Sequence, residues 1–256
     1  MNNSPIDIDK LIEGTNEILT ANRNSLQLFD MLHSMRQFDD LTYVHSVKVA
    51  LIASILGQWL KFNEKDIRIL TISGLLHDIG KIMIPNEILT KPGKLTVAEY
   101  NIMKQHVNFG YEKVKNQNID IRIKEACLLH HEKCDGTGYP VGLKSDHIPA
   151  VAKIIAIADV YDAMTSARVY RGALCPFEVI DTMYKDAFTK FEPEYILPFL
   201  KNVASSYINN DVRLSDGRIG KVVLINENAL SLPIVQCEDE FIDLSKTRGL
   251  TVSAIL

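Results

Sequence analysis

Apolar residues between positions 25 and about 209 recur at intervals of three and four. The series Val44, Val47, Leu51 and Ile55 is one example. Such spacing places the apolar side chains on one face of a helix, where they can pack against a neighbouring helix. We therefore predict that residues 25–210 form an all-helical body.

Polar residues that typically begin helices fall at the expected places in this region. Asn63 with Asp66, and Thr96 with Glu99, have the spacing of capping boxes or close relatives of them. Pro176 suits the first turn of a helix, because its missing N–H would lack an intrahelical partner there. These positions predict helix starts near residues 64, 97 and 176.

The pattern changes after Asn210 to short runs rich in β-branched residues. The runs at 218–225 and 232–236 predict strands, and Asp216 with Gly217 is a plausible turn. Residues 1–24 are polar with only a weak helical pattern, and we treat them as a leading segment. The predicted fold is mainly α, with a leading segment at 1–24, a helical catalytic domain at 25–210 and a small β-rich extension at 211–256.

Composition and charge narrow the class of protein. The chain has 256 residues, 46% of them hydrophobic, so it is long enough to bury a substantial core. Its net charge of −4 argues against a broad grip on a nucleic-acid polymer, which requires many phosphate contacts from a basic face. A small anionic ligand remains compatible if cations gather locally.

The apolar runs, the N-terminal sequence and the cysteines indicate in which cellular compartment the protein is expected. The longest apolar stretches, 49–56 and 151–160, are much shorter than the roughly 20 residues that a membrane-spanning helix needs. The start MNNSPIDIDK lacks the features of a secretory signal, so we expect a cytoplasmic protein with no membrane association. The four cysteines form no CxxC pair, and reduced thiols are favoured over a cysteine metal site.

Histidines supply the main chemical clue. Five of the seven lie in predicted helical segments, several beside an acid or another histidine: His45, His77 next to Asp78, His106, His130 and His131. A lone histidine is more often structural than a ligand, and His33 and His147 are interpreted in that way. The clustering of the other five predicts metal ligation.

The physical reason is that first-row divalent metals bind neutral imidazole and carboxylate well, and a hydrolytic pair needs about six to eight such donors. On a helix, His77 and Asp78 would project about 100° apart, so the imidazole can bind one metal while the two-oxygen carboxylate bridges to a second. His130 and His131 repeat this arrangement. Asp159 follows an apolar run that would hold it stiffly, although a helix-surface aspartate is the alternative.

Four motifs together resemble the HD-GYP branch of the HD phosphohydrolase superfamily: HDIGK at 77–81, HHE at 130–132, DGTGYP at 135–140 and IADVYDAMTSARVYR at 157–171. The resemblance covers roughly residues 30–205 and implies an HD-type helical bundle. It also implies a metal cluster in which Asp78 bridges, with the ligands His45, His77, Asp78, His106, His130, His131 and Asp159.

Iron and manganese are the metals that the resemblance implies. Some members of the family hold a third metal through a glutamate four residues before the first histidine, but Leu41 occupies that position here. The sequence therefore favours two metal ions over three.

Basic residues in the same motifs are the candidates for contact with phosphate. Lys81 follows His77 by four residues, which would put both on one helix face, and we assign it substrate binding and charge stabilisation in the transition state. A solvated surface lysine is the alternative. Arg168 and Arg171 match positions where the family has basic phosphate contacts, and helix-end cations are the competing explanation.

The DGTGYP segment predicts an ordered turn. Its Tyr139 is a candidate for stacking on a base or for contacting a partner, and Asp135 is a candidate for orienting a ligating histidine. A purely structural loop is an equal alternative. The resemblance makes a cyclase or another signalling protein the partner class for this loop, and assembly into an oligomer is compatible with the sequence.

The function implied by the resemblance is that of a metal-dependent phosphodiesterase. It would open cyclic di-GMP to linear pGpG, and cut further to GMP, through a metal-activated hydroxide, with Asp78 and Lys81 as catalytic residues. Two alternatives stay open. One is a phosphohydrolase for another nucleotide, such as cyclic GMP-AMP, and the other is a non-catalytic module that binds a cyclic dinucleotide or a partner protein.

Overall fold

The computed structural model describes residues 41–166 and 172–256, and within them the chain divides into two compact units. The first, the helical unit, comprises residues up to His131 together with 149–158. The second, the mixed unit, comprises 132–148 and the residues from Asp159 onward. The helix α9 (Ala150–Thr165) runs continuously across this boundary.

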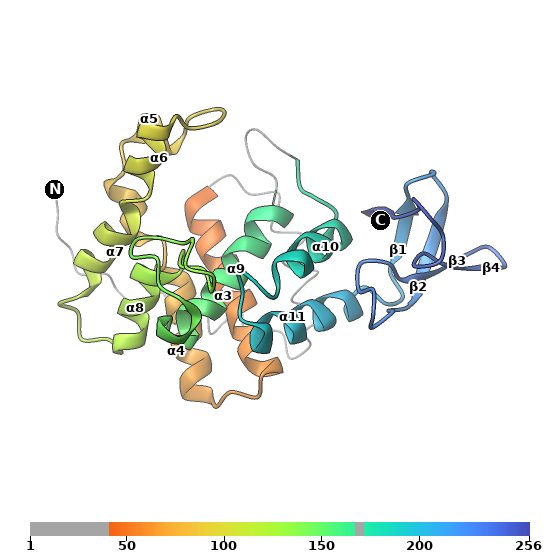
Figure 1. Ribbon diagram of the computed structural model, residues 1–256, viewed down its shortest axis with the longest axis horizontal. Coiled ribbons are helices and arrows are strands. Elements are labelled where there is room, and N and C mark those ends of the chain that lie inside the picture. The colour runs from red at the N-terminus through yellow and green to blue at the C-terminus, as the bar shows by residue number, and fades with distance from the viewer. Residues whose placement is uncertain (1–40, 167–171) are drawn as a thin grey trace. The chain divides into compact units, whose positions relative to one another are not determined.

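The helical unit is built from short helices around one long one (Figure 1). Its elements, besides the first half of α9, are α3 (Leu41–Trp59), α4 (Glu64–Leu76), the 3₁₀ helix η2 (Ile79–Met83), α5 (Asn86–Leu89), α6 (Val97–Met103), α7 (His106–Val114) and α8 (Ile121–Leu129). Helix α4 packs against both α3 and α8, and α7 packs against η2 and α8. The core between them is aliphatic, with Leu51, Ile52 and Leu70 fully buried.

The predicted helix starts are confirmed. The Asn63 side chain accepts a hydrogen bond from the Asp66 N–H at 3.0 Å, directly before α4. Thr96 and Glu99 form a reciprocal capping box at the start of α6. Pro176 is the first residue of α10 (Pro176–Asp186).

The mixed unit combines helices with one antiparallel sheet. Its remaining elements are η3 (Ser145–His147), α11 (Pro193–Ser205), β1 (Asp211–Leu214), β2 (Ile219–Leu224), β3 (Ile234–Cys237), β4 (Glu240–Asp243) and β5 (Val252–Ile255). The strand order is β4-β3-β2-β1-β5, and α10 packs against β5. Buried residues alternate with exposed ones along β1, as expected of a strand with one covered face.

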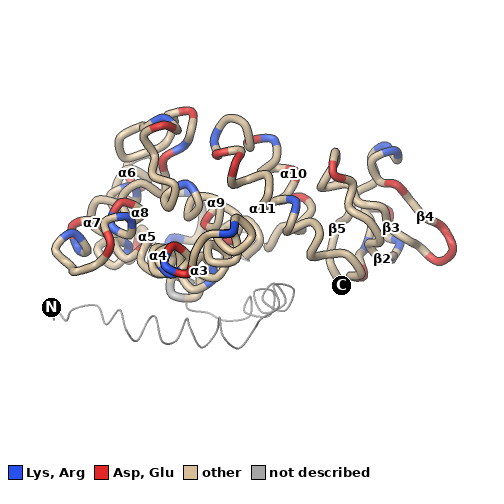
Figure 2. Tube along the Cα trace, turned by 90° about the horizontal axis from the view of Figure 1, so that it is seen from below, with Lys and Arg blue, Asp and Glu red and all other residues tan. Residues whose placement is uncertain are grey.

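The predicted fold class is confirmed: the protein is mainly α with a small C-terminal β-sheet. Strands β2 and β3 lie where the β-branched runs predicted them, and Gly217 takes a positive φ of 94° in the predicted turn. The domain boundaries predicted at residues 24 and 210 stay predictions. Among the described residues, no helix is long and apolar enough to cross a membrane. Figure 2 shows Lys and Arg interspersed with Asp and Glu along the described parts of both units.

Candidate metal centre

Six of the seven predicted metal ligands lie together in the helical unit, although they come from different elements. His45 lies within α3 and His106 is the first residue of α7. The two dipeptides each follow the end of a helix: His77 and Asp78 come directly after α4, and His130 and His131 directly after α8. Because α4 and α8 pack against each other, the two dipeptides are brought to one place.

The Asp78 carboxylate is at the centre of this cluster. Only 2% of its side chain is exposed. Its Oδ2 lies 3.6 Å from Nε2 of His45 and 3.3 Å from Nε2 of His77. Its Oδ1 lies 3.2 Å from Nε2 of His106 and 3.9 Å from Nε2 of His130. Each carboxylate oxygen therefore faces its own pair of histidines.

Backbone carbonyls fix the tautomer of three of these histidines. A carbonyl oxygen only accepts, so a ring nitrogen bonded to it carries the hydrogen, and the other nitrogen is left with a lone pair. The three contacts are His77 Nδ1 to Gly74 O at 2.8 Å, His106 Nδ1 to Met103 O at 2.8 Å, and His130 Nδ1 to Ala126 O at 2.9 Å. All three Nε2 atoms therefore present lone pairs to the cluster.

These lone pairs face other acceptors. Nε2 of His106 and Nε2 of His130 lie 3.4 Å apart, and neither has a hydrogen to share. Among the buried side-chain atoms of the described residues, His77 Nε2 and Asp78 Oδ1 have no hydrogen-bond partner. A cation between these acceptors would satisfy all of them. Candidate ligand atoms of Asp78, His106, His130 and His131 lie within 4.8 Å of one another, a spacing that suits one metal ion.

Protonation of His106 or His130 does not supply that cation at neutral pH. Burial lowers the pKa of His106, and burial together with His131 and His77 lowers the pKa of His130 well below its usual value. Burial alone would raise the pKa of Asp78, but the Lys81 ammonium and the neighbouring imidazoles hold it well below its ordinary range. Neutral imidazoles around an ionised carboxylate are the donor set that a divalent metal binds.

The local backbone corrects one feature of the sequence interpretation. His77 and Asp78 do not lie on a continuous helix, because α4 ends at Leu76 and Asp78 has φ −99° and ψ 9° before the 3₁₀ turn of η2. Lys81 is therefore three residues along that turn from Asp78, and its Nζ donates directly to Asp78 Oδ2. The lysine reaches the cluster, but not through the helix face that was expected.

Gly80 allows a close contact between η2 and α7. A Cβ at this position would lie 1.9 Å from the His106 carbonyl oxygen and 2.4 Å from the Gly110 nitrogen. Both atoms belong to the backbone of α7 and cannot move aside alone. The absence of a side chain at Gly80 lets η2 approach α7 closely, and this approach sets the position of His106 against Asp78.

For the other predicted site residues, a role in the site stays a prediction. Asp159 is buried on α9, at the point where the chain passes from the helical unit into the mixed unit. Its role as a ligand stays a prediction. Tyr139 is half-buried in the segment 135–144, and its contact with substrate stays a prediction. Arg168 and Arg171 lie outside the described residues.

The two histidines interpreted as structural have different outcomes. His147 is exposed and its Nδ1 lies 2.8 Å from Asp146 Oδ1, which fits a role outside the cluster. His33 lies outside the described residues.

Sequence reasoning assigned no role to Glu132, although the structure gives it many contacts. Its side chain is buried and accepts hydrogen bonds from the backbone of residues 141–143. The signal was present, because an acid directly after two predicted ligands and before a glycine-rich segment is well placed to hold that segment. Asp135, expected to orient a histidine, accepts from the Thr137 N–H and hydroxyl within its own loop.

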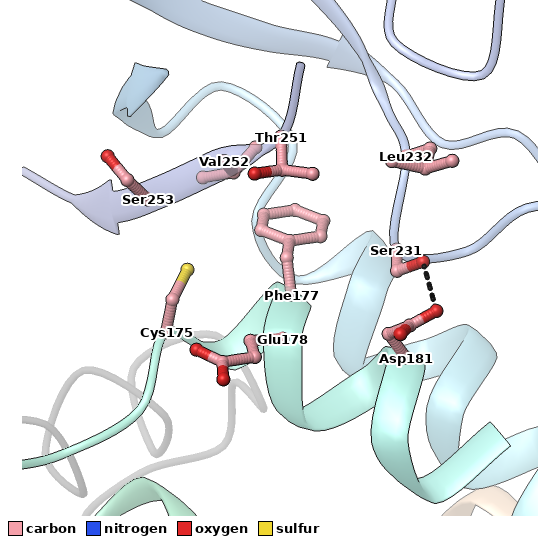
Figure 3. Close-up of a pocket in the computed structure, with 9 residues that line it drawn as sticks. All are labelled: Cys175, Phe177, Glu178, Asp181, Ser231, Leu232, Thr251, Val252 and Ser253. Carbon is pink, nitrogen blue, oxygen red and sulfur yellow. Dashed lines mark hydrogen bonds between the residues drawn. The ribbon is translucent and has the colours of Figure 1, made fainter. Parts of the chain in front are cut away.

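A separate cavity of about 510 Å³ lies within the mixed unit (Figure 3). It is lined by Cys175, Phe177, Glu178, Asp181, Ser231, Leu232, Thr251, Val252 and Ser253. Ser231 Oγ contacts Asp181 Oδ1 at 3.4 Å across its rim. None of the predicted site residues that the structure describes lines this cavity, so the chemistry is assigned to the histidine and aspartate cluster.

Comparison with known proteins identifies the family. The family model described as HD domain matches residues 16–195, more than half of the chain. The chain belongs to the HD domain family. The motifs predicted membership of the HD-GYP branch, whose members are cyclic di-GMP phosphodiesterases. Relatives of this HD domain protein carry that name, which confirms the prediction.

A cyclic di-GMP phosphodiesterase of Pseudomonas aeruginosa is 36% identical over 203 residues, which are 79% of this chain and 49% of the relative. A 3'3'-cGAMP-specific phosphodiesterase of Vibrio cholerae is 38% identical over 173 residues, 66% of this chain and 38% of the relative. The chain thus spans about half, or less, of the length of these relatives.

A solved structure shares the fold. The protein Bd1817 of Bdellovibrio bacteriovorus, described as an HDG"Y"P protein, aligns with a TM-score of 0.59 at 21% identity. The alignment covers 75% of this chain and 60% of that protein.

Proposed function

We propose that this HD domain protein is a metal-dependent phosphodiesterase that hydrolyses a cyclic dinucleotide, with cyclic di-GMP as the first candidate. The observation that carries the proposal is the arrangement around Asp78, where lone pairs of buried, neutral histidines face an ionised carboxylate with no hydrogen between them. Relatives with this domain are named for the hydrolysis of cyclic di-GMP and of 3'3'-cGAMP.

Two divalent metal ions, iron or manganese, are proposed for the site. Asp78 is proposed as the bridging ligand, because Oδ2 faces His45 and His77 while Oδ1 faces His106 and His130. His131 and Asp159 complete the proposed ligand set. A third ion is not proposed, because Leu41 offers no ligand atom at the position of the extra glutamate. The nitrogen and oxygen donors suit both metals.

When bound, divalent metals supply Lewis acidity to phosphoryl oxygens and lower the pKa of water. The residues of the chain have complementary tasks. Asp78 stays ionised and fixes the distance between the two histidine pairs. Lys81, which contacts Asp78 and is partly exposed, provides a positive charge for the phosphoryl oxygens as negative charge develops on them. Arg168 and Arg171 are proposed as further phosphate contacts, and Tyr139 as a contact for a base.

Substrate choice within the class is not decided by these residues. The relatives specific for 3'3'-cGAMP match this chain at an identity similar to those named for cyclic di-GMP. The assay therefore compares both cyclic dinucleotides. A binding module without turnover is the other outcome that the assay distinguishes.

The experiment is the Asp78→Asn substitution, which keeps the size of the side chain but removes its charge. We expect the variant to lose bound metal and to open cyclic di-GMP at least 100-fold more slowly than the wild type, since a central ligand is removed. Asp146→Asn is the matched control, because Asp146 is exposed and forms its ion pair with His147, outside the cluster. Full metal content and turnover in Asp78→Asn would refute the proposal.

A further inference from the structure

Glu132 makes an unusual set of contacts for a residue outside the metal cluster. Only 4% of it is exposed, and both of its carboxylate oxygens accept from consecutive backbone N–H groups. Oε1 accepts from Val141 at 2.8 Å and from Gly142 at 3.0 Å, while Oε2 accepts from Gly142 at 3.1 Å and from Leu143 at 2.9 Å. One side chain thus satisfies three consecutive amides that no secondary structure pairs.

The loop that Glu132 holds, residues 135–144, is closed at its base. Asp135 and Lys144 form an isolated antiparallel bridge, and Ser145 N–H donates to the carbonyl of Cys134 at 3.2 Å. Cys134 N–H in turn donates to the Lys190 carbonyl at 3.0 Å, which ties the loop base to the segment between α10 and α11. Both ends of the loop are therefore anchored within the mixed unit.

Within the loop, two glycines lie close together. Gly142 has a positive φ of 79°, and a Cβ on it would lie 3.2 Å from the Gly136 carbonyl oxygen. The two segments of the loop therefore approach through glycine backbone, and the buried Glu132 carboxylate binds the amides of the second segment. Such a loop is fixed before any ligand arrives, and it does not need to order upon binding.

We infer that Glu132 is a positioning residue that keeps the 135–144 loop preformed for substrate binding. This inference rests on the proposed function, because the loop carries Tyr139, the proposed base contact. Glu132 directly follows the proposed ligand His131 in sequence and lies three residues before the loop begins at Asp135. Substrate affinity then depends on the fraction of molecules in which the loop is closed.

The test is Glu132→Gln, with Glu194→Gln as a matched control in the same unit. Glutamine has one acceptor oxygen, and its NH₂ group would face the amide N–H groups that now donate to the carboxylate. Glu194 is exposed in the first turn of α11, so its substitution should change nothing measured here. Two quantities are measured in metal-loaded protein: amide hydrogen exchange of the peptide containing 141–143, and KM and kcat for cyclic di-GMP.

We expect Glu132→Gln to exchange these amides at least tenfold faster and to raise KM about tenfold, with kcat and metal content close to those of the wild type. Gly142→Ala disturbs the same loop without touching the carboxylate, and it should raise KM in the same way if the loop conformation is what matters. This second variant keeps the inference testable if Glu132→Gln does not fold.

Three results would overturn the inference. Unchanged exchange and KM in Glu132→Gln would mean that the loop does not depend on the carboxylate. Loss of metal and kcat at constant KM would mean that Glu132 supports the histidine pair and not the substrate. Faster exchange with an unchanged KM would mean that the loop does not contact substrate. If the wild type cleaves no cyclic dinucleotide, the proposed function fails, while hydrogen exchange still decides whether Glu132 holds the loop.

Discussion

Replacement of Gly80 by alanine should damage the metal centre, although Gly80 itself offers no ligand. The new Cβ would lie 1.9 Å from the His106 carbonyl oxygen, whereas real Cβ atoms essentially never approach another heavy atom closer than 3.0 Å. Helix α7 and η2 must therefore separate by about 1 Å or more, and His106 moves with the start of α7. Overpacking of this kind typically costs about 1–3 kcal/mol in the free energy of unfolding.

The functional cost should exceed the cost in stability. His106 Nε2 lies 3.2 Å from Asp78 Oδ1, and a displacement of about 1 Å removes this ligand from the position that it shares with His130. A misplacement of about 1 Å at a reacting centre can cost roughly 100-fold in rate. We expect Gly80→Ala to retain a folded core, to bind less metal and to lose about 100-fold in kcat/KM.

Gly110→Ala is the matched control on the other side of the same contact. Its Cβ would meet the Gly80 nitrogen at 3.4 Å and other atoms at 3.6 Å and beyond, which is ordinary van der Waals contact. Alanine also stabilises a helix interior by about 0.5–1 kcal/mol relative to glycine. Urea unfolding, metal analysis and initial rates on both variants test the reasoning. The reasoning would be refuted if the two variants had the same unfolding free energy, metal content and initial rate, or if Gly80→Ala kept the metal content of the wild type.

Two further predictions concern titratable groups away from the cluster. Burial, with a smaller contribution from the Asp78 charge, raises the pKa of the Cys127 thiol to about 12. Cys127 should therefore resist alkylation at pH 8 until the protein unfolds. Peptide mass spectrometry after brief iodoacetamide treatment checks this, and complete labelling of Cys127 in the native protein would contradict it. The Lys91 ammonium and the Thr96 cap lower the pKa of Glu99 from 4.5 to about 2, so its contribution to the start of α6 is present above pH 4.5 and is lost as the pH falls from 4.5 towards 2. Hydrogen exchange of α6 should therefore accelerate across that window in the wild type, and a Glu99→Gln variant that keeps the same acceleration would show that another group is responsible.

The ligands could be predicted from sequence because their chemical identity and order are local features. Adjacent histidines and a His-Asp pair are visible in the chain, and the cap at Asn63 depends on a residue only three positions away. The fold class could be predicted for the same reason, because the apolar periodicity of a helix is visible within a few turns of sequence.

The backbone path at the site could not be predicted in this way. The close approach of η2 to α7 is a contact between Gly80 and His106, which are 26 positions apart in the sequence. Similarly, β1, β4 and β5 have only four residues each, and short strands are stabilised by partners that lie elsewhere in the chain. Glu132 was missed because its partners are backbone amides, which the sequence does not identify, although its place between the ligand pair and a glycine-rich segment was a usable signal.

The most direct test of the account is metal-dependent turnover by the wild-type protein. The chain would be purified without oxygen, stripped of metal, and reloaded with Fe(II) or Mn(II), and products from cyclic di-GMP and 3'3'-cGAMP would be separated by chromatography. The proposed function predicts about two metal ions per chain and formation of a linear dinucleotide only in the loaded protein. Turnover that is equal with and without metal, or metal binding with no cleavage of either cyclic dinucleotide, would contradict it.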